Sequence, residues 1–188
     1  MSDEKFLKNY FQNLKILLDN EDYLKDLVRV KDILKQTHNN GKKTMIFGNG
    51  GSAAIASHFS VDLTKNAKVR CTNYNESDLL TCFSNDYGYE RWVEKAIDFY
   101  GDEGDALILI SAGGNSPNML NGANQARKKN IKTIITFTGN SSDNKLKKLG
   151  DINFWVESKA YNHIENIHQI LLLSLVDLII GKTEYPPN

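Results

Sequence analysis

The stretch that decides the fold runs from residue 44 to residue 59 and reads TMIFGNGGSAAIASHF. It opens on a short apolar run, Thr44 to Phe47, turns through the glycine-rich residues Gly48 to Ala53, and continues into a helix-length segment. An apolar strand that turns directly into a helix is the repeating unit of α/β folds with a parallel sheet. This stretch therefore predicts an α/β protein.

Three more apolar runs alternate with helix-length amphipathic segments: Ala106 to Ile110, Ile131 to Phe137 and Ile152 to Val156. A shorter run, Val69 to Thr72, provides a fifth strand. Strands that are mostly apolar are typical of parallel sheets covered by helices on both faces, because neither face meets water. We therefore predict a doubly wound α/β core over residues 43–182.

Two helices are predicted ahead of this core, within residues 1–40. In the first, apolar side chains recur every three or four residues and so share one helical face: Phe6, Tyr10, Phe11, Leu14, Leu17 and Leu18. The second is predicted from Tyr23 to His38, before Asn39-Asn40-Gly41, with these residues inward: Leu24, Leu27, Val28 and Leu34. The last helix, Asn162 to Ile180, is apolar around much of its circumference, so we expect it to contact another subunit as well as its own core.

The composition indicates one globular domain over residues 1–188. The chain has 188 residues, 40% hydrophobic and 24% charged, which is enough to bury one core. Lys plus Arg and Asp plus Glu number 23 each, so no overall charge attracts nucleic acid or an anionic membrane. Cys71 and Cys82 lie in apolar stretches, which predicts reduced core thiols rather than a disulfide.

The sequence has no pattern typical of a targeting or membrane-spanning segment. Residues 2–13 interleave charges and lack the continuous apolar core of a signal peptide. The longest apolar run, Ile170 to Ile180, is interrupted by Ser174 and Asp177 and is shorter than the roughly 20 residues that span a bilayer. We therefore predict a cytoplasmic protein.

Two glycine-rich loops follow apolar strands, at the strand ends where open α/β sheets bind ligands. In Gly48 to Ala53 the glycines let backbone N–H groups approach an anion, and the following helix N-terminus adds partial positive charge. Ser111 to Pro117 repeats the pattern, with Ser116 as a helix cap and Pro117 at the first helical position. A third segment, Ser84 to Glu90, offers polar groups to sugar hydroxyls. Together they predict a phosphosugar site, whereas each alone is equally consistent with a capped turn.

The first loop also matches the G-x-G-x-x-A pattern of dinucleotide-binding folds. That pattern requires an acidic residue about 20 positions later, which binds the ribose. Lys68 to Cys71 occupy this place, Glu76 comes too late, and two helices precede the first strand. We therefore favour a phosphosugar ligand and expect no nucleotide cofactor.

Polar residues on two helices are candidates for chemistry. His58 and Asp62 are four apart on the helix that leaves the first loop, so both project from one helical face. Asn162, Glu165 and His168 form a polar strip on the otherwise apolar last helix. One histidine with two carboxylates can bind a divalent metal, and solvent or a subunit junction is the alternative environment for these groups.

Four segments together resemble the sugar isomerase (SIS) domain family, and within it the phosphoheptose isomerases. They read GNGGSAAIASHF from Gly48, SNDYGYE from Ser84, GD.L..IS.GGNSPN from Gly104 and HIENIH from His163. The resemblance covers nearly the whole chain. It implies an SIS-type three-layer α/β/α sandwich with a five-stranded parallel sheet and two leading helices, and a homotetramer whose active sites are shared between subunits. It also implies conversion of sedoheptulose 7-phosphate to glycero-manno-heptose 7-phosphate, for lipopolysaccharide or capsule heptose synthesis.

The resemblance further implies site residues. The substrate-binding set would be Asn49, Gly50, Gly51, Ser52, Asn85, Asp86, Ser111, Ala112, Gly113, Ser116 and Glu165, with Ser111 and Ser116 holding the phosphate. The family's zinc-binding and catalytic set is His, Glu, Gln and His. Here His58 is kept, Asp62 stands at the glutamate, Glu165 replaces the glutamine and Leu173 falls at the last histidine. Gly113 also replaces a serine or threonine of the phosphate loop.

These departures bear on the chemistry. Aldose–ketose interconversion through an enediol needs a base that moves a proton between C1 and C2, and an acid or metal that polarises the oxygens. Leucine transfers no proton, and aspartate is one methylene shorter than glutamate. We expect Asp62 or Glu165 as the base, His58 as an acid or metal ligand, and zinc or another divalent ion held by these three residues.

The sequence leaves three functions open. The first is a ketose-phosphate isomerase. The second is a non-catalytic SIS protein that binds a phosphosugar or a protein partner, as does the relative that associates with the bacterial replication initiator, and Leu173 favours it. The third keeps the phosphate loops and changes the substrate to another capsule-sugar precursor, for which Ala112-Gly113 leave room.

Overall fold

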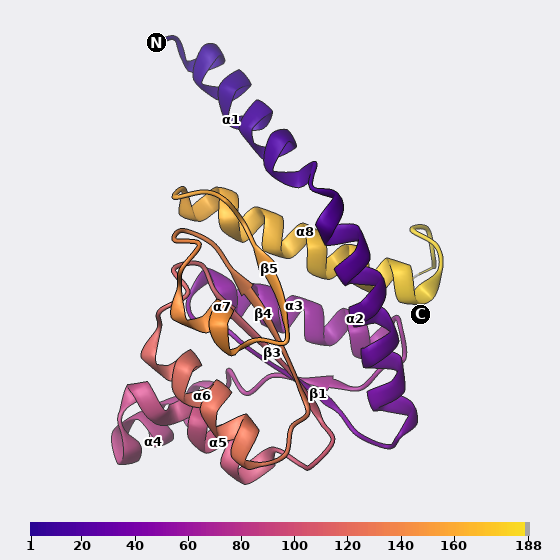
Figure 1. The fold of residues 1–188 in the computed structure, drawn as a ribbon, viewed down its shortest axis with the longest axis vertical. Coiled ribbons are helices and arrows are strands. Elements are labelled where there is room, and N and C mark those ends of the chain that lie inside the picture. Colours follow the sequence, from indigo (N-terminus) through magenta and orange to yellow (C-terminus); the bar gives the residue numbers. More distant parts are fainter. Residues whose placement is uncertain (187–188) are drawn as a thin grey trace.

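A parallel sheet of five strands divides the molecule into layers (Figure 1). The computed structural model describes residues 1–186. Its elements are α1 (Asp3–Leu18), α2 (Glu21–Asn39), β1 (Thr44–Phe47), α3 (Gly51–Lys65), β2 (Cys71–Thr72), α4 (Ser77–Tyr87), the 3-10 helix η1 (Tyr89–Arg91), α5 (Trp92–Tyr100), β3 (Ala106–Ser111), α6 (Pro117–Lys128), β4 (Thr133–Thr138), α7 (Lys145–Leu149), β5 (Ile152–Trp155) and α8 (Tyr161–Ile180). The predicted three-layer α/β/α fold is confirmed.

The strand order places two loops side by side. The order is β2-β1-β3-β4-β5, and every neighbouring pair is parallel. From β1 the chain crosses to β2 on one side and later to β3 on the other, so the loops that leave β1 and β3 diverge from a common point. Such a switch point is where doubly wound sheets bind ligands. The predicted fifth strand is present but short, and it lies at the sheet edge beside β1.

The two faces of the sheet bury separate apolar clusters. One face packs against α2, α3 and α8, with Leu34, Phe59 and Leu172 fully buried. The other packs against α5 and α6, with Trp92 and Met119 fully buried. Figure 1 shows the same division, and it shows α1 extending away from the sandwich. The mostly apolar strands are explained by this double cover.

The leading helices bury less than the sequence predicts. In α1 no residue is buried, and only Leu14 and Leu17 pack partly against the core. In α2 the buried residues are Tyr23, Leu27, Val30, Leu34 and Thr37, whereas Leu24 and Val28 are 64% and 48% exposed. The inward assignment of those two residues is wrong, because the apolar stripe of α2 is wider than the surface that it packs on.

The two cysteines have different environments. Cys71 is buried in β2, and burial raises the pKa of its thiol. Cys82 is exposed on α4, a helix with no buried residue, so the prediction of a core thiol is wrong there. Both thiols are free. A local apolar run does not distinguish the two, because α4 lies at the periphery of its layer.

Helix α8 is the one helix within residues 1–186 whose length and composition would suffice to cross a membrane. Its contacts account for this composition, because it packs against α3 and α2. Eight of its residues are buried there: His163, Ile164, Ile167, His168, Leu171, Leu172, Leu175 and Val176. Ile170 and Leu178 remain exposed on its outer side.

A buried carboxylate ties the start of β3 to the start of β1. The Asp105 side chain is fully buried and accepts hydrogen bonds from the backbone N–H groups of Lys43 and Asp102, at 3.0 and 2.9 Å. The Lys43 ammonium lies 2.6 Å from Asp105 and 2.7 Å from Asp102. Burial alone would lower the pKa of Lys43, but the bonds to the two carboxylates outweigh it and raise that pKa.

We expect Asp105→Ala to lower the free energy of unfolding by about 3 kcal/mol, because it leaves two backbone N–H groups and most of the Lys43 charge without their buried partner. Urea denaturation measures this. Asp102→Ala is the matched control: its side chain is 67% exposed, so we expect a much smaller loss than in Asp105→Ala. Equal losses in the two variants would contradict this account.

Candidate functional site

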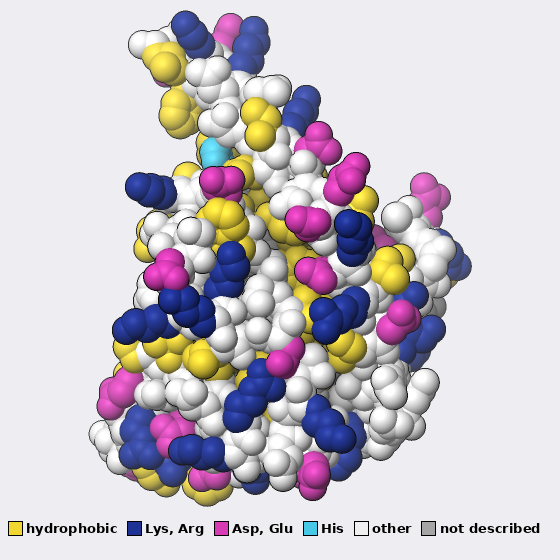
Figure 2. Space-filling model, in the orientation of Figure 1, with side chains coloured by type: hydrophobic (Ala, Val, Ile, Leu, Met, Phe, Trp, Pro, Cys, Tyr) yellow, Lys and Arg dark blue, Asp and Glu magenta, His cyan; other side chains and the backbone are white. Residues whose placement is uncertain are grey.

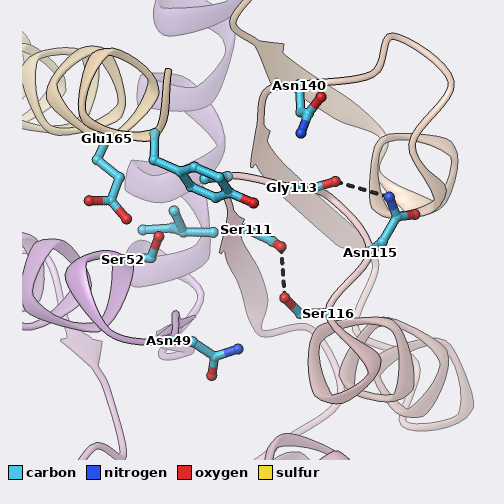
Figure 3. A pocket seen from close by; sticks show the side chains of 11 residues that line it. Asn49, Ser52, Ser111, Gly113, Asn115, Ser116, Asn140 and Glu165 are labelled. Atoms are coloured by element: carbon cyan, nitrogen blue, oxygen red, sulfur yellow. Dashed lines mark hydrogen bonds between the residues drawn. The ribbon is translucent and has the colours of Figure 1, made fainter. Parts of the chain in front are cut away.

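A pocket of about 460 Å³ opens at the switch point between β1 and β3 (Figure 3). It is lined by Asn49, Ser52, Ile110, Ser111, Ala112, Gly113, Asn115, Ser116, Asn140, Tyr161 and Glu165. These residues come from the end of β3, from the loops that follow β1, β3 and β4, and from the first turns of α3 and α8. The volume is within the usual range for a small-molecule site.

The first loop presents the N-terminus of α3 to the pocket. Gly50 is the N-cap residue and has a φ of +54°, a left-handed conformation that favours glycine. No side chain caps α3, so the first N–H groups of the helix remain available to a ligand. Ser52, in the first turn, is only 3% exposed and lines the pocket with its hydroxyl.

The second loop faces the first. The hydroxyls of Ser111 and Ser116 are 3.1 Å apart (Figure 3). Ser116 is the N-cap of α6, with Pro117 at the start of the helix as predicted, but its side chain bonds to Ser111 rather than to the helix backbone. Gly114 has a φ of +65° and passes so close to Asn144 that a side chain there would collide with it. The loop therefore points hydroxyls and a free helix end at the same space.

The lining of this pocket contains no lysine or arginine. Two helix N-termini, those of α3 and α6, supply its positive potential. Hydroxyl donors and uncapped N–H groups at helix N-termini bind phosphate without a cation. The pocket therefore has the polarity expected for a phosphate group.

One carboxylate faces this phosphate-type end from α8. Glu165 lines the pocket and lies directly against Gly51, where a Cβ atom would approach its carboxylate to 2.5 Å. Figure 3 shows the side chain of Glu165 directed into the pocket near Ser52. The N-terminus of α3 favours the ionised form of a carboxylate placed there. A side chain at position 51 would therefore displace the Glu165 carboxylate from this place.

A pair of amides clamps the two loops together. Asn118 donates to Asn49 Oδ1 at 2.8 Å, and Asn49 donates back to Asn118 Oδ1 at 3.1 Å. Asn118 is only 1% exposed, and the Tyr89 hydroxyl adds a third bond, 3.0 Å to Asn49 Oδ1. The amide of Asn49 is therefore held in one orientation at the pocket rim.

A family model described as the SIS domain matches residues 9–139. The chain belongs to the SIS domain family. Among curated relatives, the phosphoheptose isomerase of Fusobacterium nucleatum is 30% identical over 186 residues, which is 96% of this chain and 94% of that protein. The phosphoheptose isomerase of Buchnera aphidicola is 32% identical over 187 residues, 96% of this chain and 92% of that protein.

Solved structures of phosphoheptose isomerases superpose on this SIS domain. The enzyme of Neisseria gonorrhoeae is 25% identical, with a TM-score of 0.85 over 94% of this chain and 98% of that one. The structure from Francisella tularensis is 24% identical, with a TM-score of 0.86 over 97% of this chain and all of that one, and at this identity it supports the fold alone.

The SIS domain does not gather the predicted metal ligands. His58 and Asp62 do not line the pocket, whereas Glu165 does. Within residues 1–186 no three His, Cys, Asp or Glu side chains lie close enough to hold one ion. The described residues of one chain therefore do not bring the three predicted ligands together, and metal binding stays a prediction. The reason is spacing: His58 lies about 10 Å along α3 from the helix start, at 1.5 Å per residue.

Asn85 and Asp86 also lie outside the pocket lining. Both are exposed on α4, and the Asn85 amide donates to Asp86 Oδ1 at 2.9 Å. The segment after them does reach the site, because η1 carries Tyr89 to Asn49. Their role in substrate binding stays a prediction.

Several residues at the site are absent from the sequence-based set, among them the apolar Ile110 at the end of β3. Asn115 lies inside the quoted GGNSPN motif, and Asn118 closes that motif. Asn140 follows β4, so the rule that ligands bind beyond strand ends would have found it. Tyr161 begins α8, and no local sequence pattern indicates that it lines the pocket. Its hydroxyl would lie 3.7 Å from a Cβ at Gly113, so the missing serine or threonine leaves open space.

His168, one of the polar strip on the last helix, lies in the core. It is fully buried, its Nε2 is 3.1 Å from the carbonyl oxygen of Thr138, and its Nδ1 has no partner. Burial lowers the pKa of His168 to about 4, although the bond to Thr138 acts in the opposite direction. At neutral pH this residue is an uncharged part of the core that holds α8 to β4.

We expect His168 to make stability depend on pH. The unfolded chain binds its proton near pH 6.5 and the folded chain only near pH 4, so the contribution is complete above pH 6.5 and is lost as the pH falls to about 4. The loss is roughly 3 kcal/mol. Urea denaturation between pH 6.5 and pH 4 should show this loss of unfolding free energy in the wild type and not in His168→Gln.

His38→Gln is the control for this experiment, because His38 is only partly buried on α2. It should keep the wild-type dependence on pH. If His168→Gln also keeps it, His168 is not the group responsible.

Proposed function

We propose that this SIS domain is a cytoplasmic phosphosugar isomerase that interconverts a ketose phosphate and an aldose phosphate. The observation that carries the proposal is the arrangement of one pocket: the hydroxyls of Ser111 and Ser116 and the N-terminus of α6 lie at one side, and the carboxylate of Glu165 lies at the other, beside the N-terminus of α3. The relatives named phosphoheptose isomerase support the same reaction class.

The phosphate end of the substrate binds at Ser111, Ser116 and the N-terminus of α6. The two hydroxyls, 3.1 Å apart, release their mutual bond and donate to phosphate oxygens. Ser52 and the N-terminus of α3 donate to the sugar from the opposite wall, beside Glu165. This anchor holds the sugar in one position, which is how binding energy at a remote group accelerates the reacting centre.

Glu165 acts as the base on the carbons near the carbonyl group. It removes a proton from C1 of the open-chain ketose, and the electron pair forms the enediolate with its charge on O2. A proton then passes from O1 to O2, and the same carboxyl returns its proton to C2, which leaves the aldehyde at C1. Its carboxylate reaches into the pocket, whereas Asp62 does not line it, which favours Glu165 over Asp62 for this role. No step is assigned to a metal, because residues 1–186 of one chain bring no three His, Cys, Asp or Glu side chains together.

We propose sedoheptulose 7-phosphate as the substrate, and lipopolysaccharide or capsule heptose synthesis as the pathway. The names of the curated relatives support this substrate. The open space opposite Tyr161, where Gly113 has no side chain, also admits a different sugar phosphate. A direct comparison of ketose phosphates as substrates separates these alternatives.

We also propose that copies of the chain associate through α1, as a homotetramer with shared active sites. On α1 the large apolar side chains are exposed, Phe6 by 59%, Phe11 by 57% and Ile16 by 61%, and Figure 2 shows yellow side chains along this projecting helix. A helix with no fully buried residue in its own chain is stabilised when its apolar face packs against another surface. The pocket beside α1 includes Tyr161, which also lines the candidate active site, so association there affects that site.

A second function has one specific observation in its favour. Leu173, half-buried on α8, stands where the family has a catalytic histidine, and it offers no group for proton transfer or metal binding. A protein that binds a phosphosugar, or a protein partner, without turnover would keep the pocket and tolerate this change. Binding of sedoheptulose 7-phosphate without any product identifies this case.

We expect the protein to convert sedoheptulose 7-phosphate, and NMR of the aldose product measures this turnover. We expect Glu165→Gln to reduce kcat by at least about 100-fold because the base is lost. Binding of the substrate should persist in this variant. Glu157→Gln is the matched control, since Glu157 is exposed and outside the pocket lining. Full activity in Glu165→Gln would exclude it as the base.

We expect Phe11→Glu to convert the assembly into smaller species in light scattering, because burial of each phenylalanine contributes about 2 kcal/mol and a buried charge opposes association. Lys8→Glu changes charge on the same helix at an exposed polar position and should keep the wild-type mass. A monomeric wild-type protein would disprove the proposal.

A further inference from the structure

We propose that Gln169 is a positioning residue for His58. Its amide donates a hydrogen bond to the one ring nitrogen of neutral His58 that has a lone pair. This histidine is then a hydrogen-bonded neutral imidazole and not a metal ligand. This inference deepens the proposed function, and the role of Gln169 in catalysis rests on that function. It starts from a cluster on the seam between α3 and α8, formed by His58, Asp62, Asn66 and Gln169.

Both ring nitrogens of His58 have a partner. Its Nε2 lies 3.3 Å from Oδ2 of Asp62, one helical turn further along α3. Its Nδ1 lies 3.2 Å from the amide nitrogen of Gln169, which comes from α8. The ring is therefore held between two helices that pack against each other.

The two partners select one tautomer. A neutral imidazole has one nitrogen that donates and one that accepts. The Asp62 carboxylate only accepts, so it requires a proton on Nε2, and the Gln169 amide nitrogen only donates, so it requires a lone pair on Nδ1. The two requirements are complementary and are satisfied together by the neutral ring with its proton on Nε2.

Asp62 is itself oriented by the same cluster. Its second oxygen, Oδ1, accepts a hydrogen bond of 3.2 Å from the amide of Asn66. Both carboxylate oxygens of Asp62 are thus engaged, one with His58 and one with Asn66. This makes Asp62 a group that orients the imidazole, in place of the base or metal ligand that its position in the sequence implies.

A metal ion binds imidazole through a nitrogen lone pair. In neutral His58 only Nδ1 has one, and the Gln169 amide occupies it. A metal at this nitrogen would have to displace Gln169 and would find no other two ligating side chains close by within residues 1–186. The donor set of this chain therefore does not fit zinc.

The cluster lies next to the proposed active site. Gln169 follows Glu165 by four residues, which is one turn or about 6 Å along α8. Glu165 lies against Gly51 at the start of α3, and Gln169 lies against His58 further along the same helix. The His58 ring is about half exposed, so the cluster continues the polar side of the seam away from the pocket.

The first experiment reads the tautomer directly. In long-range proton–nitrogen NMR spectra of the full protein at neutral pH, without substrate or metal, we expect the neutral His58 ring to carry its proton on Nε2. Gln169→Leu removes the donor and should lose this single tautomer, giving a mixture. Gln36→Leu, an exposed glutamine on α2, is the matched control and should leave the spectrum unchanged.

The second experiment tests metal binding with zinc alone. Calorimetric titration of the metal-free protein should give no stoichiometric zinc binding that is lost in His58→Gln. One tightly bound zinc per chain in the wild type, lost in His58→Gln, would overturn the proposal. A proton on Nδ1 of His58, or a tautomer unchanged by Gln169→Leu, would overturn it as well.

Neither readout requires turnover. Absence of isomerase activity together with the expected tautomer would reject the proposed function and keep the assignment of Gln169. Isomerase activity together with a proton on Nδ1 of His58 would keep the proposed function and reject the assignment of Gln169. If the protein is active and His58 has the expected tautomer, Gln169→Leu should lower kcat more than it raises KM, because the substitution leaves the residues that bind the phosphate unchanged.

Discussion

The pairing of β1 with β3 is the interaction on which the rest of this structure depends. Four residue pairs, from Thr44 with Ala106 to Phe47 with Leu109, align the two strands so that they end at the same edge of the sheet. The buried Asp105 and its bonds to Lys43 fix the opposite ends of the strands. Because the chain leaves β1 and β3 in different directions, two helix N-termini point at one space. Without this register the glycine-rich loops would be two unrelated turns.

The site obtains its positive potential from backbone, not from cationic side chains. The pocket lining has no lysine or arginine, and the uncapped ends of α3 and α6 take their place. Such a site costs little side-chain entropy, because its donors belong to the main chain and to short serines. It also depends on precise loop geometry, which explains the clamp between Asn49 and Asn118 and the close contact of Gly114 with Asn144.

Helix α8 both packs into the core and carries polar residues to the pocket and to the seam with α3, and apolar and polar residues alternate along its sequence. Its apolar residues fill the core between α2, α3 and the sheet. Its polar residues are distributed among three environments: Glu165 in the pocket, His168 in the core and Gln169 at the seam with α3. Residues three and four apart thus differ in role because the helix touches different neighbours on each side, although they share a local pattern.

The sequence by itself determined the α/β class, the order and approximate bounds of the strands and helices, the two phosphate-type loops and the family. These follow from local chemistry, namely apolar runs, glycines and helix caps, and a single chain segment carries each signal. It did not determine which side of α2 meets the core, that Cys82 is exposed, or that His58 and Asp62 lie outside the pocket. Only the tertiary structure decided these, because each depends on which distant segment packs against the residue. The contact between Gln169 and His58 joins residues 111 positions apart, and no local pattern encodes such a distance.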